Sequence, residues 1–337
     1  MIEKSVFTIE LPYRDPMDVR GFFFGIDASG RSLGNGARMR SLRRSLCLVA
    51  GLRGDEIQQT FVCAMLVDYL RKMESSQALM PDNMVCVIPC ANPASMGIGR
   101  RFWPGDKTDV NRQFPGKQDG DTTQRIAAGI FAHVRGYRYG IHLSSFYLDG
   151  DFLPHVRIMH GPGEDRNHGA EFGLPYVTHY SPAKLDVTTL HYNWRQCGTE
   201  AYTFYTQETT VADEVAASEA VRSILRFMSA RSIARPLNAG GRRSVELAEQ
   251  SLVPVSVPTG GVFCPQVQIG SVVEKGQPIA CVRDLLRGCT TAGMVAPCDG
   301  VVFFRRRTPL VNEQTLAFQI APPHPTPRHT KTNDPTS

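Results

Sequence analysis

The sequence predicts an α/β protein with a mostly parallel mixed sheet flanked by helices, followed by a small all-β domain. Up to residue 231, short apolar runs alternate with segments of helical spacing. After Arg235, Pro and Gly recur, Val and Ile alternate, and no segment has helical periodicity. From these changes we expect an α/β domain at 1–235, a small β-domain at 236–321, and a Pro-, Thr- and His-rich disordered tail at 322–337.

The α/β domain is organised around residues 46–56. Leu46–Ala50 is an apolar run typical of a buried strand, and the glycines that follow it permit a sharp turn. Asp55 and Glu56 come next, and apolar residues then recur at helical spacing to about Glu74. We expect a strand, a tight turn and a helix whose first turn carries both carboxylates. Open α/β sheets hold ligands at such strand ends, although first-turn carboxylates also stabilise a helix through its macrodipole.

The remaining elements of this domain alternate in the same way. The apolar run at 84–89 follows the helix, and this strand–helix–strand order predicts a parallel pair with a right-handed crossover. Residues 92–120 lack periodicity, and a loop of this length in a compact domain is usually functional. Further strands are expected at 5–11, 139–144, 156–159 and 176–177, with an apolar stretch at 21–26 and helices at 122–134 and 213–231.

The small domain contains an internal repeat. Pro258–Val262 matches Pro297–Val301, and each is followed at a similar interval by a looser match, Val273–Ile279 against Val311–Leu316. Two similar halves of short strands predict a pseudo-symmetric β-sandwich or barrel, which resembles the biotinyl/lipoyl-like sandwich. Carriers of that kind present a lysine between the halves, but residues 283–288 contain none. We therefore expect a structural module, which could supply an interface for a homo-oligomer.

Composition and charge narrow the functional class. The 337-residue chain is 42% hydrophobic with a formal net charge of +5, which is ordinary globular chemistry and suits an anionic small substrate. We expect a cytoplasmic protein because no apolar run could span a bilayer, no signal peptide is evident and the nine cysteines are scattered. The arginine-rich runs at 38–44 and 305–307 lack interleaved aromatic residues, so we expect solvated faces and neither a nucleic-acid nor a membrane partner.

One stretch of the long loop indicates a family. Asp109-Val-Asn-Arg-Gln-Phe-Pro-Gly116, preceded by Arg101, resembles the motif of the succinylglutamate desuccinylase/aspartoacylase family, which shares the zinc-carboxypeptidase fold. The resemblance extends to the turn at 51–56, to His142 at a strand end, to the Thr-x-Glu pattern at 206–208 and to the small β-domain. It implies a zinc-carboxypeptidase-like domain and a hydrolase that cleaves the amide bond of an N-acyl amino acid or a related small carboxylate.

The same resemblance implies a metal site. Glu56 and His142 would bind one zinc ion, and Glu208 would be the general base that activates a metal-bound water. The chemistry is consistent, because zinc lowers the pKa of bound water to about 7 and a carboxylate can then take its proton.

The resemblance also assigns substrate-binding residues. Arg101, Asn111 and Arg112 would hold a substrate carboxylate and polarise the scissile carbonyl, which places Arg101 among the catalytic residues as well. A guanidinium binds a carboxylate with two parallel hydrogen bonds, and a cation can stabilise a developing oxyanion.

The chain departs from the family pattern at two positions. The family's first metal ligand is a histidine three residues before the glutamate, and this sequence has Arg53 there. Arginine stays protonated and has no lone pair to donate. An aspartate that often precedes the strand-end histidine is replaced by Ile141. Two protein ligands remain, where catalytic zinc normally has three.

Three explanations for Arg53 are open. Another residue could complete the site, and the candidates are Asp55, His155, His160 and His191. The Arg53 guanidinium could instead replace the metal, pairing with Glu56 and contributing to substrate binding. Zinc could also bind weakly through two protein ligands and water. The leading hypothesis is a zinc-dependent deacylase, and the alternative is a metal-free family member that binds a small carboxylate through its arginines.

Each candidate residue also has an ordinary structural explanation. Glu56 could be a favourable first-turn carboxylate, and His142 a core histidine bonded to a backbone carbonyl. The two loop arginines could pin the loop by pairing with Asp106 and Asp109, and Glu208 could be an exposed turn residue. Their joint occurrence at the family spacing favours the functional interpretation.

Overall fold

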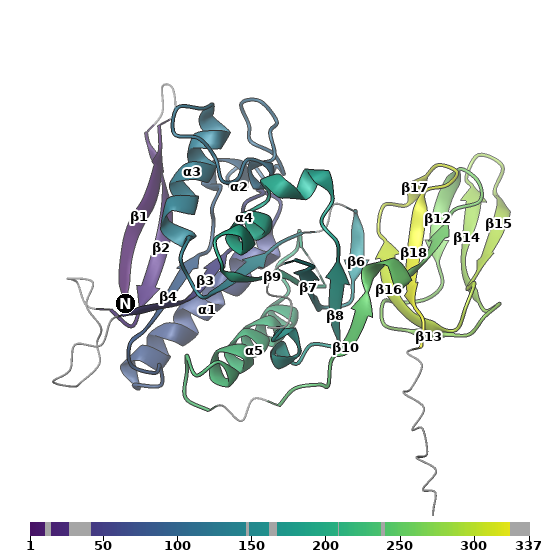
Figure 1. Cartoon of the computed structure of the whole chain (residues 1–337). Coiled ribbons are helices and arrows are strands. Elements are labelled where there is room, and N and C mark those ends of the chain that lie inside the picture. Colours follow the sequence, from purple (N-terminus) through teal and green to yellow (C-terminus); the bar gives the residue numbers. More distant parts are fainter. Residues whose placement is uncertain are drawn as a thin grey trace, which may run out of the picture. The chain divides into compact units, whose positions relative to one another are not determined.

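The computed structural model describes residues 1–10, 15–26, 42–145, 148–161, 167–207, 209–236 and 240–323 (Figure 1). The chain forms two compact units. The first comprises residues 1–147 and 152–249, and the second comprises residues 148–151 and the chain from Gln250 onward. No helix in the described ranges is long and apolar enough to cross a membrane. The expected tail falls almost entirely outside the described residues.

The first unit is built on a nine-stranded sheet in the order β1-β2-β4-β3-β5-β9-β7-β8-β10. Neighbours are parallel from β4 through β3 and β5 to β9, and again from β7 through β8 to β10, whereas β1–β2, β2–β4 and β7–β9 are antiparallel. The expected mixed, mostly parallel sheet is confirmed. The strands are β1 (Ile2–Ile9), β2 (Met17–Phe24), β3 (Arg43–Val49), β4 (Asn83–Ile88), β5 (Tyr139–Leu143), β7 (His155–Met159), β8 (Tyr176–Tyr180), β9 (Glu200–Tyr205) and β10 (Val245–Ala248).

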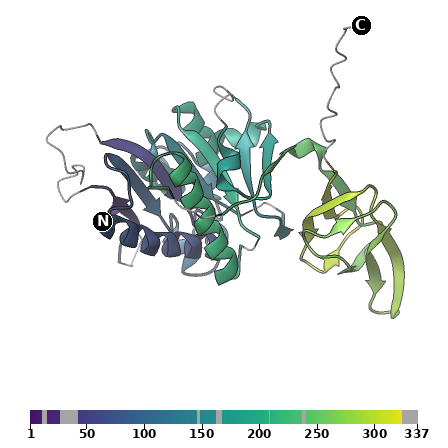
Figure 2. The ribbon, with the colours of Figure 1, turned by 90° about the horizontal axis from the view of Figure 1, so that it is seen from below.

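Helices cover both faces of this sheet. α1 (Ile57–Ser75) and α5 (Glu214–Ala230) lie side by side on one face (Figure 2), and α3 (Thr122–Val134) and α4 (Leu190–Gln196) cover the other. A hydrophobic core lies on each face of the sheet, and alternate residues of β3 point into one core and then the other. This explains why β3 is a continuous apolar run. Shorter helical turns are α2 (Pro93–Met96) and the 3-10 helices Val110–Arg112, Gly169–Phe172, Lys184–Thr188 and Glu249–Ser251.

The predicted strand, turn and helix around residue 50 are confirmed, with one correction. Helix α1 begins at Ile57, so neither Asp55 nor Glu56 lies in its first turn. Glu56 occupies the N-cap position but accepts no capping hydrogen bond through its side chain. Glu56 therefore lies just before the first turn of α1, and the hydrogen-bond partners of its side chain lie elsewhere.

The first unit extends further along the chain than the composition suggested. β10 adds to the large sheet by pairing in parallel with β8, so the structural boundary falls after Glu249 and not at residue 235. Residues 240–245 have no helical pattern, which is why composition alone assigned them to the small domain.

The second unit is a sandwich of two sheets (Figure 1), and the strands of its two halves correspond to the internal sequence repeat. One sheet has the order β15-β14-β12-β17 and the other β11-β18-β16-β13. The short strand β13 of the first repeat pairs with β16 of the second, and the short strand β17 of the second repeat pairs with β12 of the first. The predicted pseudo-symmetric sandwich is confirmed. The strands are β11 (Val253–Ser256), β12 (Gly261–Pro265), β13 (Val272–Val273), β14 (Pro278–Asp284), β15 (Cys289–Val295), β16 (Gly300–Arg306), β17 (Leu310–Val311) and β18 (Leu316–Ala321).

The glycine shared by the two repeats is required by close strand packing. A Cβ at Gly261 would lie 2.8 Å from Arg283 O on β14, and a Cβ at Gly300 would lie 2.3 Å from Ala321 O on β18. Because both glycines open equivalent strands, the Pro-x-x-Gly-Val repeat reflects one packing requirement met twice.

The basic run at 305–307 has a structural role. Arg305 Nη2 donates to Asp151 Oδ2 at 2.6 Å, and Arg307 donates to the other oxygen of the same carboxylate. Asp151 belongs to β6 (Gly150–Phe152), which pairs with β16. Two of these arginines therefore hold a distant stretch of chain against the small unit. Arg307 remains exposed, as the sequence suggested, and Arg305 is partly buried.

Candidate functional site

The turn after β3 brings Arg53 into the interior of the first unit. Gly51 has φ +62°, and Gly54 donates its N–H to Arg101 O at 3.3 Å. A Cβ at Gly54 would lie 2.2 Å from the carbonyl carbon of Ser95, so only glycine lets the turn approach residues 95–101 this closely. The Arg53 side chain is consequently buried, at 5% exposure.

Arg53 is held by two carboxylates. Its Nε and Nη2 donate to Asp109 Oδ2 at 3.1 and 2.9 Å, and its Nη1 donates to Glu56 Oε1 at 3.3 Å. Nη1 also reaches Ser144 Oγ at 3.2 Å and Ser145 O at 3.4 Å. Burial alone would lower the pKa of Arg53, but Asp109 and Glu56 outweigh it and raise this pKa above its usual value. Arg53 is therefore a permanent buried cation.

Glu56 is fully buried, and its carboxylate accepts hydrogen bonds from neighbouring groups of the protein. Oε1 accepts hydrogen bonds from the N–H and the Oγ of Ser145, both at 2.8 Å, and from Ser144 Oγ at 3.4 Å. Oε2 accepts the backbone N–H of Arg53 at 3.2 Å. Together with Asp109, these residues form what we call the Arg53 cluster: Arg53, Glu56, Asp109, Ser144 and Ser145.

His142 lies on β5 beside the Arg53 cluster, at 2% exposure. Burial lowers the pKa of His142 to about 3, the Arg53 guanidinium lowers it as well, and Asp109 acts in the opposite sense. The ring is therefore neutral at pH 7. Its Nε2 is buried and has no hydrogen-bond partner among the described residues. An unsatisfied buried nitrogen is uncommon and often marks a functional position.

Arg101 lies at the edge of the Arg53 cluster. Its Nη1 donates to Ser145 Oγ at 3.0 Å and to Asp55 Oδ2 at 3.4 Å, and its side chain is 25% exposed. Burial raises the pKa of Asp55, and Arg101 partly opposes this. The second oxygen of Asp55 is buried without a partner in the described part of the chain. Arg101 thus combines contact with the cluster and access to solvent.

Asn111 and Arg112 face a different segment. Asn111 Oδ1 accepts the N–H of Leu190 at 3.4 Å, at the start of α4. Arg112 Nη1 donates to Leu185 O and to Asp186 Oδ1, the latter at 3.3 Å. The expected pairing of the loop arginines with Asp109 is not observed, because that carboxylate is taken by Arg53. Asn111 and Arg112 anchor the residues before α4, while Arg101 and Arg53 meet at Ser145.

Glu208, the expected general base, lies outside the described residues. The strand end that leads to it is described, and it is tied to the Arg53 cluster. Gln59 Nε2 donates to Thr206 Oγ1 at 3.2 Å and to Ser144 O at 3.4 Å. The end of β9 therefore lies beside the end of β5, as parallel neighbours require.

The four candidates for a third metal ligand each have other contacts, although Asp55 Oδ1 and His191 Nε2 are buried without a hydrogen-bond partner in the described residues. Asp55 binds Arg101, His155 Nδ1 contacts Leu153 O at 2.7 Å, and His160 stacks on His179. His191 lies close enough to His142 for each to disfavour protonation of the other, but its Nδ1 contacts Thr203 Oγ1 at 2.6 Å.

The donor set near Glu56 does not fit a zinc ion. Within the described ranges, no group of three or more His, Cys, Asp or Glu side chains is placed to hold a metal. The Glu56 carboxylate is bonded to a guanidinium, which cannot be a ligand. Among the described histidines, His142 and His191 each have a buried Nε2 without a hydrogen-bond partner. A metal could bind between Glu56 and His142 only if the Arg53 side chain moved away.

Comparison with known proteins places this arrangement in a family. The sequence profile of the succinylglutamate desuccinylase/aspartoacylase catalytic domain matches residues 43–231, more than half of the chain. The chain belongs to the succinylglutamate desuccinylase/aspartoacylase family. Members of this family are deacylases, and the matched region contains the whole Arg53 cluster together with His142 and Arg101.

Solved structures of other proteins share the fold across nearly the whole chain. The succinylglutamate desuccinylase/aspartoacylase of Rhodobacter sphaeroides has a TM-score of 0.72 and 15% identity, covering 94% of this chain and 95% of its own. A succinylglutamate desuccinylase from a Silicibacter species has a TM-score of 0.72, 16% identity and 92% coverage of both chains. The product-bound ectoine utilization protein EutE of Ruegeria pomeroyi has a TM-score of 0.71 and 16% identity, covering 90% and 89%. Among curated proteins, no significant sequence match is found.

Sequence reasoning missed Ser144 and Ser145. They lie at and just after the end of the strand expected at 139–144, and the position at a strand end in a parallel sheet was the available signal. Asp109 was noted within the family motif, but its partner Arg53 lies 56 positions away, and no local pattern could reveal that pairing.

A buried histidine near the site predicts how stability depends on pH. Burial lowers the pKa of His155 to about 3 from its usual 6.5. Below pH 6.5 the unfolded chain binds a proton there and the folded chain does not, so the free energy of unfolding falls as pH drops from 6.5 towards 3. We expect His155→Asn, which keeps a donor for Leu153 O, to reduce this slope in urea unfolding measured at several pH values. His133→Asn on α3 serves as the control for the chemical change from histidine to asparagine.

Proposed function

We propose that this chain is a metal-free member of its family that binds a small N-acyl amino acid or related carboxylate at the Arg53 cluster. The observation that carries the proposal is the Arg53 guanidinium bonded to Glu56 and Asp109. In the family pattern, Glu56 and the residue at position 53 would both face a zinc ion. Here a fixed positive charge is supplied by the protein, with its charge balanced by two carboxylates of the same chain.

Arg101 is the residue we propose to contact the ligand carboxylate. Its guanidinium is partly exposed and touches the cluster through Ser145 Oγ. A guanidinium offers five N–H donors in a planar fork, so contacts with Ser145 and Asp55 are compatible with a bidentate contact to a carboxylate.

The test uses N-succinyl-L-glutamate, the compound in the family's name, with N-acetyl-L-aspartate as a second probe. Isothermal titration of the full chain in the presence of EDTA is expected to show saturable binding. Arg101→Met should weaken it by about tenfold or more, because one charge-assisted hydrogen bond is worth roughly that factor. Arg125→Met, an exposed arginine on α3, is the control and should bind as the unaltered chain does.

A second candidate function is favoured by His142. Its neutral ring and unpartnered Nε2 are what a metal ligand needs, so a zinc-dependent deacylase would become the better description if Arg53 left Glu56. Release of succinate that requires added zinc, measured in the same samples, would support this candidate and contradict the metal-free proposal. Absence of binding both with and without zinc would contradict both.

A further inference from the structure

A cavity lies beside helix α5 in the first unit. It encloses about 560 Å³, which is within the usual range for small-molecule sites, and it forms where β9 ends and where β7, β8 and β10 begin. Its lining shares no residue with the Arg53 cluster. Apolar walls come from both the sheet and the helix, and they include Leu153, Leu174, Pro175, Phe204, Val215 and Ala220.

Three arginines line this cavity. Arg226 is anchored by its Nε to Phe172 O at 2.9 Å and by its Nη2 to Ser223 Oγ at 2.7 Å. Arg222 lies one turn earlier on α5, and Arg242 approaches from the chain before β10, its N–H donating to Gly173 O at 3.1 Å. Neither the Arg222 nor the Arg242 side chain forms an ion pair within the described ranges. Burial lowers the pKa of Arg226, the carboxylate of Glu219 opposes this effect, and the positive charge of Arg222 adds to it.

Two glycines shape the wall around Arg226. A Cβ at Gly173, where φ is +64°, would lie 2.8 Å from Arg226 Nε, and a Cβ at Gly241 would lie 3.2 Å from Arg226 Cδ. The absence of both side chains leaves room for the arginine stem between two stretches of backbone. The guanidinium is therefore positioned at the cavity by packing and is not simply a mobile surface group.

The acidic groups in the lining do not balance this charge. Asp213 is used as the N-cap of α5, where its Oδ1 accepts the N–H groups of Val215 and Ala216 at 2.9 and 3.0 Å. Glu219 is the other carboxylate of the lining. Three guanidinium groups thus meet two carboxylates in the lining, one of which caps α5, so the lining keeps an excess of positive charge.

We propose that this cavity is a second binding site, for a small organic anion that carries an apolar group. The arginines would bind its carboxylate or phosphate, since planar guanidinium groups match both anions. The apolar walls would cover its hydrocarbon part. The site is independent of the carboxylate proposed to bind at Arg101.

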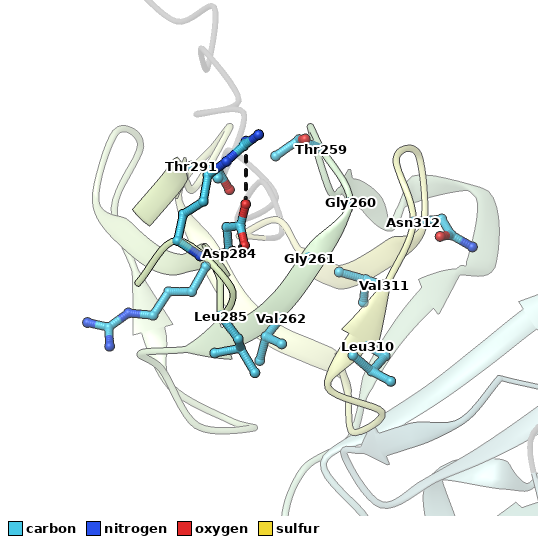
Figure 3. Close-up of a pocket in the computed structure, with 12 residues that line it drawn as sticks. Thr259, Gly260, Gly261, Val262, Asp284, Leu285, Thr291, Leu310, Val311 and Asn312 are labelled. Carbon is cyan, nitrogen blue, oxygen red and sulfur yellow. Dashed lines mark hydrogen bonds and ion pairs between the residues drawn. The ribbon is translucent and has the colours of Figure 1, made fainter. Parts of the chain in front are cut away.

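A cavity in the small unit offers a matched comparison (Figure 3). It measures about 630 Å³ and is also lined by two arginines and by apolar side chains, among them Val262, Leu285 and Leu310. There, however, Arg287 pairs with Asp284 at 3.6 Å, as the dashed line in Figure 3 shows. Its positive charge already has an internal partner, so we expect the anion to prefer the cavity beside α5.

The test is a fluorescence titration of the full chain with 8-anilinonaphthalene-1-sulfonate, an anion with an apolar body. We expect saturable binding that weakens about tenfold in the Arg222→Gln/Arg242→Gln double variant, because two charge-assisted contacts are lost. Val215→Asp should weaken dye binding similarly, because it adds a negative charge to the lining of the cavity. Val215 is 76% exposed and lies in the first turn of α5, where an aspartate is favourable, so the substitution should not disturb the helix. Thermal unfolding of each variant checks that the fold is kept.

Competition and controls decide between ligand classes. 4-Phenylbutyrate and phenyl phosphate should displace the dye, and their relative strength tells whether carboxylate or phosphate is preferred. Inorganic phosphate alone should displace it poorly. Arg287→Gln in the small unit and Arg101→Met at the first site should leave dye binding unchanged. Unaltered binding in the Arg222/Arg242 variant, loss of binding in Arg287→Gln, or equal displacement by inorganic phosphate would each overturn the proposal.

Discussion

Replacing Arg53 with methionine is expected to destabilise the first unit by about 3–5 kcal/mol, which is the usual cost of removing one partner from a buried ion pair. Arg53 is 5% exposed and Glu56 is fully buried. Without the guanidinium, the fully buried Glu56 carboxylate would lose its ion-pair partner, and the partly buried Asp109 would lose the same partner. Urea unfolding of Arg53→Met beside the unaltered chain measures the change.

Two controls separate the lost ion pair from lost packing. Arg20→Met removes an arginine that contacts Glu3 and Asp18 on the surface of the β1–β2 hairpin, and it should change stability little. Arg53→Met/Glu56→Met removes both charges of the buried pair and should recover part of the loss, since paired apolar residues tolerate burial. A cost for Arg53→Met no larger than that for Arg20→Met would show that the buried pair does not hold the turn.

Replacing Arg53 with histidine is expected to create a zinc site. The imidazole would join Glu56 and His142, giving the three protein ligands that catalytic zinc requires. His142 is prepared for this role because its ring is neutral and its Nε2 has no partner among the described residues. We expect about one zinc ion per chain of Arg53→His by elemental analysis, and a thermal midpoint that rises when zinc is added.

The second ligand can be tested within the same variant. Arg53→His/His142→Asn should lose the zinc that Arg53→His gains, whereas Arg53→His/His133→Asn should keep it. If Arg53→His bound no zinc, Glu56 and His142 would not be arranged as the family pattern implies. The assignment of these two residues would then be wrong, independently of what Arg53 does.

Local periodicity was sufficient to predict most of the fold. Packing that depends on a few neighbouring residues leaves a clear pattern in the sequence. Examples are the apolar run of β3, which is buried on both faces, the helical spacing of α1 and α5, and the repeat in the small unit. Helix α4 was not predicted, because Leu190–Gln196 is short and mixes aromatic and polar residues. β10 was not predicted either, since its place in the large sheet depends on a partner strand some seventy positions earlier.

The candidate site was predicted only in part, for the same reason. Arg53, Glu56 and Arg101 were identified from their positions in the family pattern, and the structure brings them together at Ser145. The bond between Arg53 and Asp109 depends on how the long loop folds back over the turn, and no sequence spacing expresses that. Of the alternatives left open for Arg53, the geometry favours the guanidinium standing beside Glu56 in place of a metal.

The measurement that tests the central claim most directly is the zinc content of the unaltered chain after equilibrium dialysis against zinc, with Arg53→His dialysed in the same buffer. The account predicts far less than one zinc per chain for the unaltered protein and about one for the variant. Near one zinc per unaltered chain, lost in both Glu56→Ala and His142→Ala, would contradict it and establish that the family metal site is intact.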